Sequence, residues 1–247
     1  MRLQDRERER ACFEVLRQLP REGVVLIGGY ALSAFGMTRF SVDLDLVVPS
    51  STAGEIRKIL DREGFVLEKT WDGGGSYAGR SERWTRGASG TAISVDLLIG
   101  GVSDRTSGAS HPYRELRSRA IARRIHGQDP TSEAEVLVVD RETLIALKLG
   151  VGRLVDLRDV AVLAADPVDE DAIVALLRRV PEEIVRGNIE RLLLALDTRE
   201  FRDSLKGVYV LDDRAYARIA SGARRLALSL LGRTQVGEGK GTPRESR

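Results

Sequence analysis

The sequence predicts a chain of the α/β (α+β) class, in which an α/β N-terminal part is followed by a helical C-terminal part. Two observations predict it. Short apolar runs with the length of strands, at 24–27, 42–48 and 93–99, recur in the first 140 residues and alternate with segments of helical spacing. From residue 140 onward every strongly patterned segment has the length and spacing of a helix.

The first 139 residues are expected to form an α/β domain. Pro20 should end the first helix, Gly36 and Gly64 should end the next two, and Thr52 with Glu55 has the spacing of a capping box. Expected helices cover 12–19, 30–35 and 52–63, and expected strands cover 24–27, 42–48, 65–71, 82–85, 93–99 and 136–139. The Gly-rich segment 72–79 reads as a mobile loop, 102–110 as irregular, and 113–125 is Arg-rich without a clear pattern.

The segment 140–232 is expected to form a helical C-terminal domain. Asp140 can cap its first helix. The expected helices cover 141–150, 155–165, 170–179, 181–196 and 213–231. The remaining residues, 233–247, are polar and Gly-rich, which predicts a disordered tail.

Composition excludes several classes of protein. One cysteine, Cys12, and two histidines among 247 residues exclude a zinc finger, a disulfide framework and an Fe–S cluster held by one chain. The formal net charge of +2 does not demand a nucleic-acid partner. No apolar run approaches the roughly 20 residues that span a membrane, and the N-terminus has no signal-peptide core, so we expect a cytoplasmic protein without a membrane partner.

Three aspartates on expected strands are the candidate chemical groups. Asp43 and Asp45 are two residues apart on one strand, so their side chains share a face and repel each other unless a cation lies between them. Asp96 interrupts another, otherwise apolar strand. Hard oxygen ligands suit Mg²⁺, and three such carboxylates can hold two metal ions for phosphoryl transfer. The alternative is that Asp43 and Asp45 lie on an exposed edge strand.

A glycine pair precedes these aspartates. Gly28 and Gly29 stand between a buried strand and a short helix, where a backbone without side chains can approach a phosphate closely. A structural turn would also explain the two glycines. The run is neither a Walker A loop nor a Gly-x-Gly-x-x-Gly fingerprint.

The order Gly-Gly-x-Ala, short helix, Arg-x-Ser/Thr-x-Asp-x-Asp resembles the nucleotidyltransferases of the DNA polymerase beta superfamily. The resemblance is closer to the small prokaryotic branch that includes the AbiEii-type toxins of abortive-infection and toxin–antitoxin systems. Here the motif consists of Gly28, Gly29, Ala31, Arg39, Ser41, Asp43 and Asp45. A second match downstream, over about 144–159, contains Lys148, Asp156 and Asp159. The chain departs from the branch at Tyr30, where Ser is frequent, and at Val155, where Lys is common.

The resemblance implies a nucleotidyltransferase-like fold, with a mixed sheet flanked by helices, and a role for each matching residue. Gly28, Gly29, Arg39, Ser41 and Lys148 would bind the nucleotide. Asp43, Asp45 and Asp96 would bind Mg²⁺, with two ions expected, and Asp96 would also orient or deprotonate the acceptor hydroxyl. Together with Lys148, these three aspartates form the implied catalytic set. Asp156 and Asp159 would support Lys148 or Arg153, or act near the acceptor. For Lys148, the alternative is a structural ion pair on a helix that faces the core.

The hypothesis is an Mg²⁺-dependent enzyme that moves an NMP group from an NTP to an acceptor hydroxyl, with tRNA, a protein or a small antibiotic-like molecule as possible acceptors. A toxin role with an antitoxin partner follows from the resemblance alone. The non-catalytic alternative is a nucleotide- or RNA-binding protein with a degenerate site. The arginines of segment 113–126 are either a solvated face or a patch for a phosphate-rich acceptor.

Overall fold

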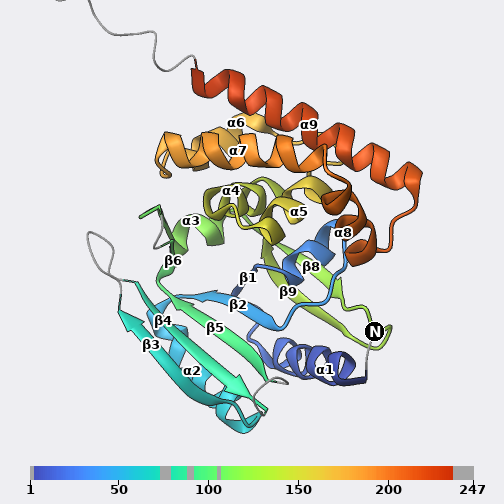
Figure 1. The fold of residues 1–247 in the computed structure, drawn as a ribbon. Coiled ribbons are helices and arrows are strands. Elements are labelled where there is room, and N and C mark those ends of the chain that lie inside the picture. Colours follow the sequence, from blue (N-terminus) through green and yellow to red (C-terminus); the bar gives the residue numbers. More distant parts are fainter. Residues whose placement is uncertain (1–2, 73–78, 88–91, 105–106, 236–247) are drawn as a thin grey trace, which may run out of the picture. The chain divides into compact units, whose positions relative to one another are not determined.

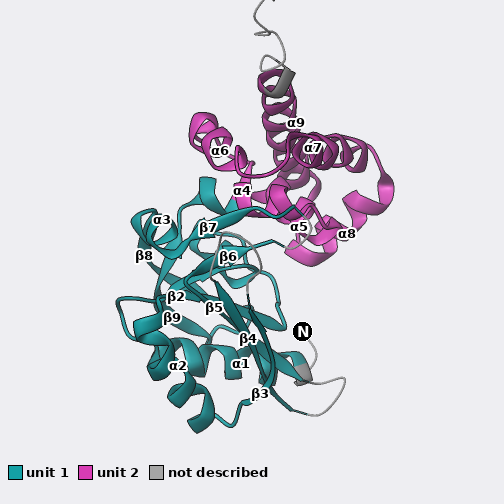
Figure 2. Cartoon of the chain, turned by 90° about the vertical axis from the view of Figure 1, so that its left-hand side faces the viewer, with its two compact units in different colours: residues 1–144 teal, residues 145–247 magenta. Residues whose placement is uncertain are grey.

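The computed structural model describes residues 3–72, 79–87, 92–104 and 107–235. It divides into two compact units, residues 1–144 and 145–247 (Figure 2). This division lies five residues beyond the predicted boundary at 139. The structure confirms the predicted fold class, with a mixed sheet, flanking helices and a helical C-terminal part (Figure 1).

Unit 1 is built on a seven-stranded sheet in the part of the chain that the structure describes. Its strand order is β3-β4-β5-β2-β1-β9-β8. The pairs β2–β5 and β1–β9 are parallel, and the other neighbours are antiparallel. The strands are β1 (Val25–Ile27), β2 (Asp43–Val48), β3 (Val66–Asp72), β4 (Arg80–Arg86), β5 (Ile93–Ile99), β8 (Ala120–His126) and β9 (Glu133–Val139).

Two helices pack on one face of this sheet. Helix α1 (Leu3–Gln18) contacts β9 and β5, and α2 (Ser50–Arg62) contacts β5 and α1 (Figure 1). The apolar side of α2 is fully covered, with Ala53, Ile56 and Leu60 buried. The predicted capping box is wrong, because α2 starts two residues earlier, after Pro49, without a side-chain cap. Cys12 is buried on α1, and burial raises the pKa of its thiol to about 12.

Segments without a clear pattern acquire structure from their partners. The segment expected to be irregular contains the short hairpin of β6 (Gly101–Ser103) and β7 (Ser110–Pro112). The Arg-rich segment forms α3 (Tyr113–Ser118) and then the edge strand β8. The short helix after the glycine pair is a 3₁₀ helix, η1 (Tyr30–Phe35), which ends at Gly36. Most of the predicted Gly-rich loop, 73–78, lies outside the described residues.

Unit 2 is helical throughout its described part. Helix α4 (Arg141–Val151) crosses the boundary at 144 and is capped as predicted, since the Asp140 carboxylate accepts a hydrogen bond from the Thr143 backbone. The helices that follow are α5 (Leu154–Leu163), α6 (Glu170–Leu177), α7 (Glu182–Leu196), α8 (Arg199–Tyr209) and α9 (Asp213–Gln235). The sequence did not predict α8. Helix α9 continues through 233–235, three residues into the expected tail, and 236–247 lie outside the described residues.

Candidate active site

The predicted aspartates lie on two neighbouring central strands. Strand β2 is hydrogen-bonded to β5 on one side and to β1 on the other, so the alternative of an exposed edge strand is wrong. In the parallel register, Asp45 is opposite Asp96 and Asp43 is opposite Ser94. Paired residues on adjacent strands project to the same side of a sheet. The fold therefore gathers all three carboxylates on one face.

This face is the one opposite helix α2. Glu82 on β4 pairs in register with Leu97 and is bonded to Arg57 of α2, so Leu97 and its paired neighbours face the helix. Side chains alternate along a strand, which puts Asp96 and its register partner Arg83 on the other side. The back of each site strand is apolar because Leu44, Leu46 and Val95 fill the core.

Two of the aspartates are held by neighbours that sequence patterns did not reveal. Asp96 accepts two parallel hydrogen bonds from Arg83, at 2.8 Å from Nε and 2.7 Å from Nη2. Asp43 accepts a hydrogen bond from the Ser94 hydroxyl. The alternation of side chains along β4 could have shown which face Arg83 lies on. Its position opposite Asp96 depends on the register between β4 and β5, which the sequence pattern does not determine.

The first residue of the glycine pair lies against the carboxylate of Asp45. Gly28 has φ +74°, and a Cβ added there would overlap the carboxylate of Asp45. A side chain at residue 28 is thus excluded twice, by backbone conformation and by the carboxylate. Ile27, the last residue of β1, is the register partner of Asp45, so the next residue, Gly28, lies beside the Asp45 carboxylate.

Gly29 is equally crowded by other motif residues. A Cβ on Gly29 would lie 2.7 Å from the Ser41 hydroxyl oxygen and 3.0 Å from Nη2 of Arg39. Tyr30, where the chain departs from the motif of its branch, donates a hydrogen bond of 2.7 Å to the Ser41 carbonyl. Burial raises the pKa of the Tyr30 phenol, which keeps the hydroxyl protonated as a donor. The structure therefore brings Gly28, Gly29, Arg39 and Ser41 together.

The remaining predicted residues form a separate group in unit 2. The Lys148 ammonium donates to Asp159 at 2.5 Å and lies 3.7 Å from Asp156. Asp159 also accepts a hydrogen bond from the Tyr209 hydroxyl on α8, and Asp156 is bonded to Arg153 at 2.7 Å. Lys148 is only 6% exposed and Asp159 is fully buried. The predicted support of Lys148 by the two aspartates is thus a buried ion-pair network within this unit.

The donor set on the sheet face suits a divalent cation. Asp43 and Asp45 are half-buried carboxylates on one face of β2, and carboxylate oxygens are ligands that divalent cations prefer. Among the residues that the structure describes, no group of three Asp, Glu, His or Cys side chains is close enough to hold one metal ion. The third carboxylate of the predicted metal set, Asp96, is bonded to Arg83.

The Arg-rich segment is partly neutralised. Arg119 lies 3.2 Å from Asp140, and Arg124 lies 3.1 Å from Glu135 on the neighbouring strand. These pairs favour the interpretation as a solvated face.

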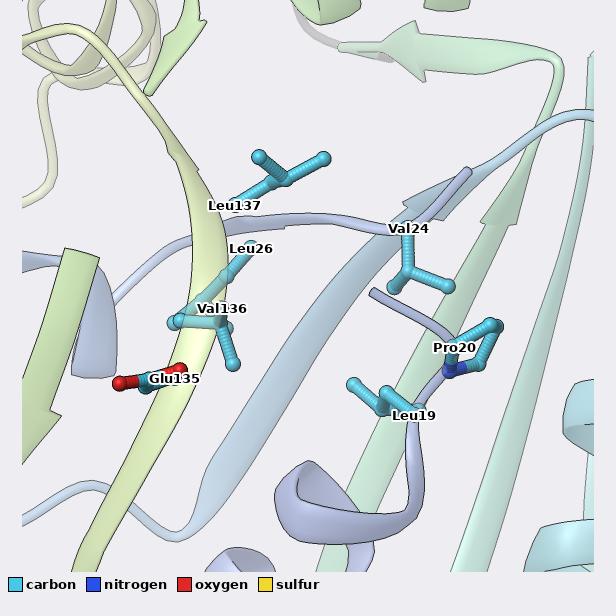
Figure 3. A pocket seen from close by; sticks show the side chains of 7 residues that line it. All are labelled: Leu19, Pro20, Val24, Leu26, Glu135, Val136 and Leu137. Atoms are coloured by element: carbon cyan, nitrogen blue, oxygen red, sulfur yellow. The ribbon is translucent and has the colours of Figure 1, made fainter. Parts of the chain in front are cut away.

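A small pocket elsewhere in unit 1 is lined mainly by apolar side chains from the end of α1 and from β1 and β9 (Figure 3). None of the residues that line it is a predicted site residue.

One family model matches most of the chain. The family model "Nucleotidyl transferase AbiEii toxin, Type IV TA system" matches residues 13–225. Curated protein sequences give no match. Within the described part of the chain, none of the helices is long and apolar enough to cross a bilayer.

Three solved structures show similarity at low identity. JHP933 from Helicobacter pylori shares 17% identity over 95% of this chain and 94% of that chain, with a TM-score of 0.43. TM1012 from Thermotoga maritima, proposed to be a nucleotidyltransferase, shares 19% identity over 57% and 81%, with a TM-score of 0.38. The antibiotic-resistance factor ANT(2″)-Ia shares 15% identity over 94% and 99%, with a TM-score of 0.37.

The family match extends from α1 into α9. It includes the three aspartates of unit 1 and the ion-pair network around Lys148 in unit 2. The chain therefore belongs to the AbiEii nucleotidyltransferase toxin family and is a nucleotidyltransferase.

Proposed function

We propose that this nucleotidyltransferase uses a divalent cation held by Asp43 and Asp45 to transfer an NMP group from an NTP to an acceptor hydroxyl. The acceptor oxygen forms a bond to the α-phosphorus. The bond between that phosphorus and the bridging oxygen of the β-phosphate breaks, and pyrophosphate leaves with the electron pair while the hydroxyl proton passes to solvent.

The observation that carries this proposal is the position of Asp45. It lies over Gly28 and beside Asp96, at the point where the glycine pair meets the carboxylate strand. Bound Mg²⁺ would neutralise charge on the phosphates and orient the α-phosphorus. What the protein supplies is position, since β2 is fixed on both sides by neighbouring strands.

The proposed nucleotide contacts follow from the crowding around Gly29. We assign the triphosphate to the backbone N–H groups of Gly28 and Gly29, with the Ser41 hydroxyl and the Arg39 guanidinium as additional donors. Ser41 and Arg39 lie against the position that a Cβ on Gly29 would take, which supports this assignment. Donors fixed in place before the substrate arrives cost little reorganisation during the reaction.

Lys148 is proposed to contact the β- and γ-phosphates, and this role stays a prediction. Its side-chain nitrogen donates a hydrogen bond to Asp159, which orients it. Asp96 is proposed either as a further metal ligand or as the group that orients the acceptor hydroxyl.

Two radioactive labels test the reaction class. Purified protein is incubated with Mg²⁺, total cell extract and each NTP, labelled either at the α- or at the γ-phosphate. The expected result is that α-label enters a macromolecular or small-molecule fraction while γ-label appears only in pyrophosphate. Transfer of γ-label to the acceptor would mean phosphoryl rather than nucleotidyl transfer and would reject the proposal.

Variants connect the label to the site. The pair Asp43→Asn with Asp45→Asn keeps side-chain size and removes both charges, and we expect it to abolish transfer. Asp61→Asn, an exposed residue of α2, serves as the matched control and should transfer normally. Transfer by the double variant at the control's rate contradicts the proposed site, and thermal unfolding of each variant verifies that it is folded.

A toxin role in the cytoplasm, countered by an antitoxin partner, is the biological part of the proposal, and it rests on the family description. Ribonuclease and protease treatment of the labelled extract identifies the acceptor as RNA, protein or a small molecule. Expression in a host should arrest growth only when Asp43 and Asp45 are intact. Growth arrest by the Asp43→Asn, Asp45→Asn variant would separate toxicity from nucleotidyl transfer.

A further inference from the structure

We infer that Ser94 is a positioning residue, whose hydroxyl fixes the carboxylate of Asp43 for the divalent cation of the proposed reaction. The inference rests on the proposed function and deepens it, because it names a residue outside the motif on which one of the two proposed metal ligands depends. Ser94 itself contacts neither the cation nor the nucleotide in this scheme and acts through Asp43.

The two proposed ligands are supported differently by the sheet. The β1–β2 pair ends where Ile27 lies opposite Asp45, so Asp43 lies beyond its end. Asp45 therefore has a paired residue on each side, in β1 and in β5, whereas Asp43 is paired through β5 alone among the described strands. The position of Asp43 consequently depends on the residue that lies opposite it in β5.

Ser94 is that residue, and it binds the start of β2 twice. Its backbone N–H donates a hydrogen bond of 3.0 Å to the Val42 carbonyl, and its hydroxyl donates to Oδ1 of Asp43. The first bond fixes the main chain next to Asp43. The second fixes the carboxylate group, whose rotation about the last side-chain bond is otherwise only loosely restricted. One residue thus holds both the backbone and the side chain at this position.

A hydroxyl is chemically suited to this task. Its bond to a carboxylate is charge-assisted, so it is stronger than a hydrogen bond between neutral groups. The bond uses one of about four acceptor positions on the carboxylate, so Asp43 keeps positions for a cation. A serine also carries no charge, so it orients the carboxylate without cancelling the negative charge that attracts the cation, as a lysine or arginine would.

The burial of Ser94 argues against an incidental serine. Its side chain lies in an apolar strand between Ile93 and Val95, which are both buried, and Ser94 itself is only 8% exposed. A hydroxyl in such a run costs free energy unless it is hydrogen-bonded, and strands favour β-branched apolar residues at such positions. The group that satisfies this hydroxyl is a proposed metal ligand. The serine is therefore explained by the site and not by the packing of the core.

Mn²⁺ binding without nucleotide tests the inference apart from catalysis. Free Mn²⁺ is measured by its electron paramagnetic resonance signal during titration of the protein. Ser94→Ala should weaken binding about tenfold, because loss of a hydrogen bond to a ligating carboxylate typically costs about 10- to 100-fold in metal affinity. Ser94→Thr keeps the hydroxyl and should bind within about threefold of wild type. Unchanged affinity in Ser94→Ala, or equal weakening in a folded Ser94→Thr protein, overturns the inference.

Two further proteins make the result interpretable. Ser229→Ala in unit 2 is the matched control, because it removes a bond of the same kind, from a serine hydroxyl to the carboxylate of Glu170, and it should leave Mn²⁺ affinity unchanged. The Asp43→Asn, Asp45→Asn protein tests the proposed function itself. A wild type that binds no Mn²⁺, or a double variant that binds it as tightly as wild type, contradicts the proposed function. Normal binding by Ser94→Ala beside a weakened double variant contradicts only the role of Ser94.

The Mg²⁺ dependence of nucleotide transfer separates positioning from a structural role. Transfer of α-label in dialysed extract is measured against Mg²⁺ concentration. Ser94→Ala should raise the Mg²⁺ concentration for half-maximal transfer about tenfold, with a rate at saturating Mg²⁺ within about threefold of wild type. A rate lowered by the same factor at every Mg²⁺ concentration indicates loss of folded protein and overturns the inference. If thermal unfolding shows that Ser94→Ala is misfolded, Ser94→Cys replaces it with the same expected direction, because a thiol is only a weak donor.

Discussion

The carboxylate of Asp45 lies over the α-carbon of Gly28, in the space that any side chain at residue 28 would occupy. The glycine is at the end of β1 and the aspartate is inside β2, so two hydrogen-bonded strands meet at this contact. The position of a proposed metal ligand thus depends on the absence of a side chain on its neighbour.

Gly28→Ala should cripple nucleotide transfer. The added methyl group must displace Asp45, and misplacement of a reacting group by about 1 Å can cost on the order of 100-fold in rate. Gly36→Ala is the matched control, because Gly36 has a similar φ of +77° but no atom within 4 Å of an added Cβ. Both variants should lose about 1–2 kcal/mol of stability from the left-handed backbone. Equal transfer rates for the two would contradict the proposed role of this contact.

Lys148 and Asp159 should be strongly coupled in stability. Removing one member of a buried ion pair leaves the other charge without its nearest partner, so Lys148→Met and Asp159→Asn should each cost about 3–5 kcal/mol. The combined variant should regain much of that loss in urea unfolding. If Lys148 also contacts phosphate, the combined variant is stable but does not transfer nucleotide. Recovery of both properties would make the pair purely structural.

The aspartate face could be predicted from sequence because its signals are local. Asp43 and Asp45 share a face through the two-residue repeat of a strand, and Gly28 immediately follows an apolar run. What no local pattern contains is strand order. That β2 is central, and that Asp45 is beside Asp96, depends on pairing between segments about fifty residues apart.

The parts that sequence reasoning missed depend on partners distant in the chain. Arg83 is one of many arginines until its register with Asp96 is known. Helix α8 has few apolar residues, and its burial rests on Phe201, Leu205 and Tyr209. The last of these donates to Asp159, so the helix that the pattern did not reveal completes the network around Lys148.

Asn188 should be important for the packing of α7 against the end of α4. Its amide donates a hydrogen bond of 2.7 Å to the Leu149 carbonyl, and a Cβ on Gly152 would overlap the same amide. Asn188→Ala leaves that buried carbonyl without this donor, which should cost about 1–3 kcal/mol in chemical unfolding. Gly187→Ala, at the adjacent residue, is the control, because an added Cβ meets nothing within 4 Å. The higher helix propensity of alanine should stabilise this variant by about 0.5–1 kcal/mol. A similar loss in both variants would show that α7 is sensitive to any change.

Protonation of Glu82 should make the protein less stable in acid. Its side chain is 1% exposed and accepts two hydrogen bonds of 2.9 Å from Arg57 and one of 3.2 Å from Trp84. Burial alone would raise the pKa of this carboxyl, but the bonds from Arg57 and Trp84 and the charges of Arg57 and Arg80 outweigh it and lower the pKa. A group whose pKa is lower in the folded state stabilises the fold above its unfolded pKa, and this contribution is lost as the pH falls through the folded pKa.

Urea unfolding of the wild type and of Glu82→Gln at pH 7, 5 and 3 measures this contribution. At pH 7 the variant should be less stable by about 1–3 kcal/mol, since hydrogen bonds to a charged group are replaced by bonds to a neutral amide. The gap should narrow below pH 5, because the wild-type carboxyl then binds a proton on unfolding and loses its advantage. Glu190→Gln, in an exposed pair with Arg186, should differ from wild type by no more than about 0.5 kcal/mol at each pH. A gap for Glu82→Gln that stays constant from pH 7 to 3 would contradict the role of the charge, because protonation of the wild-type carboxyl would then remove none of its stabilising effect.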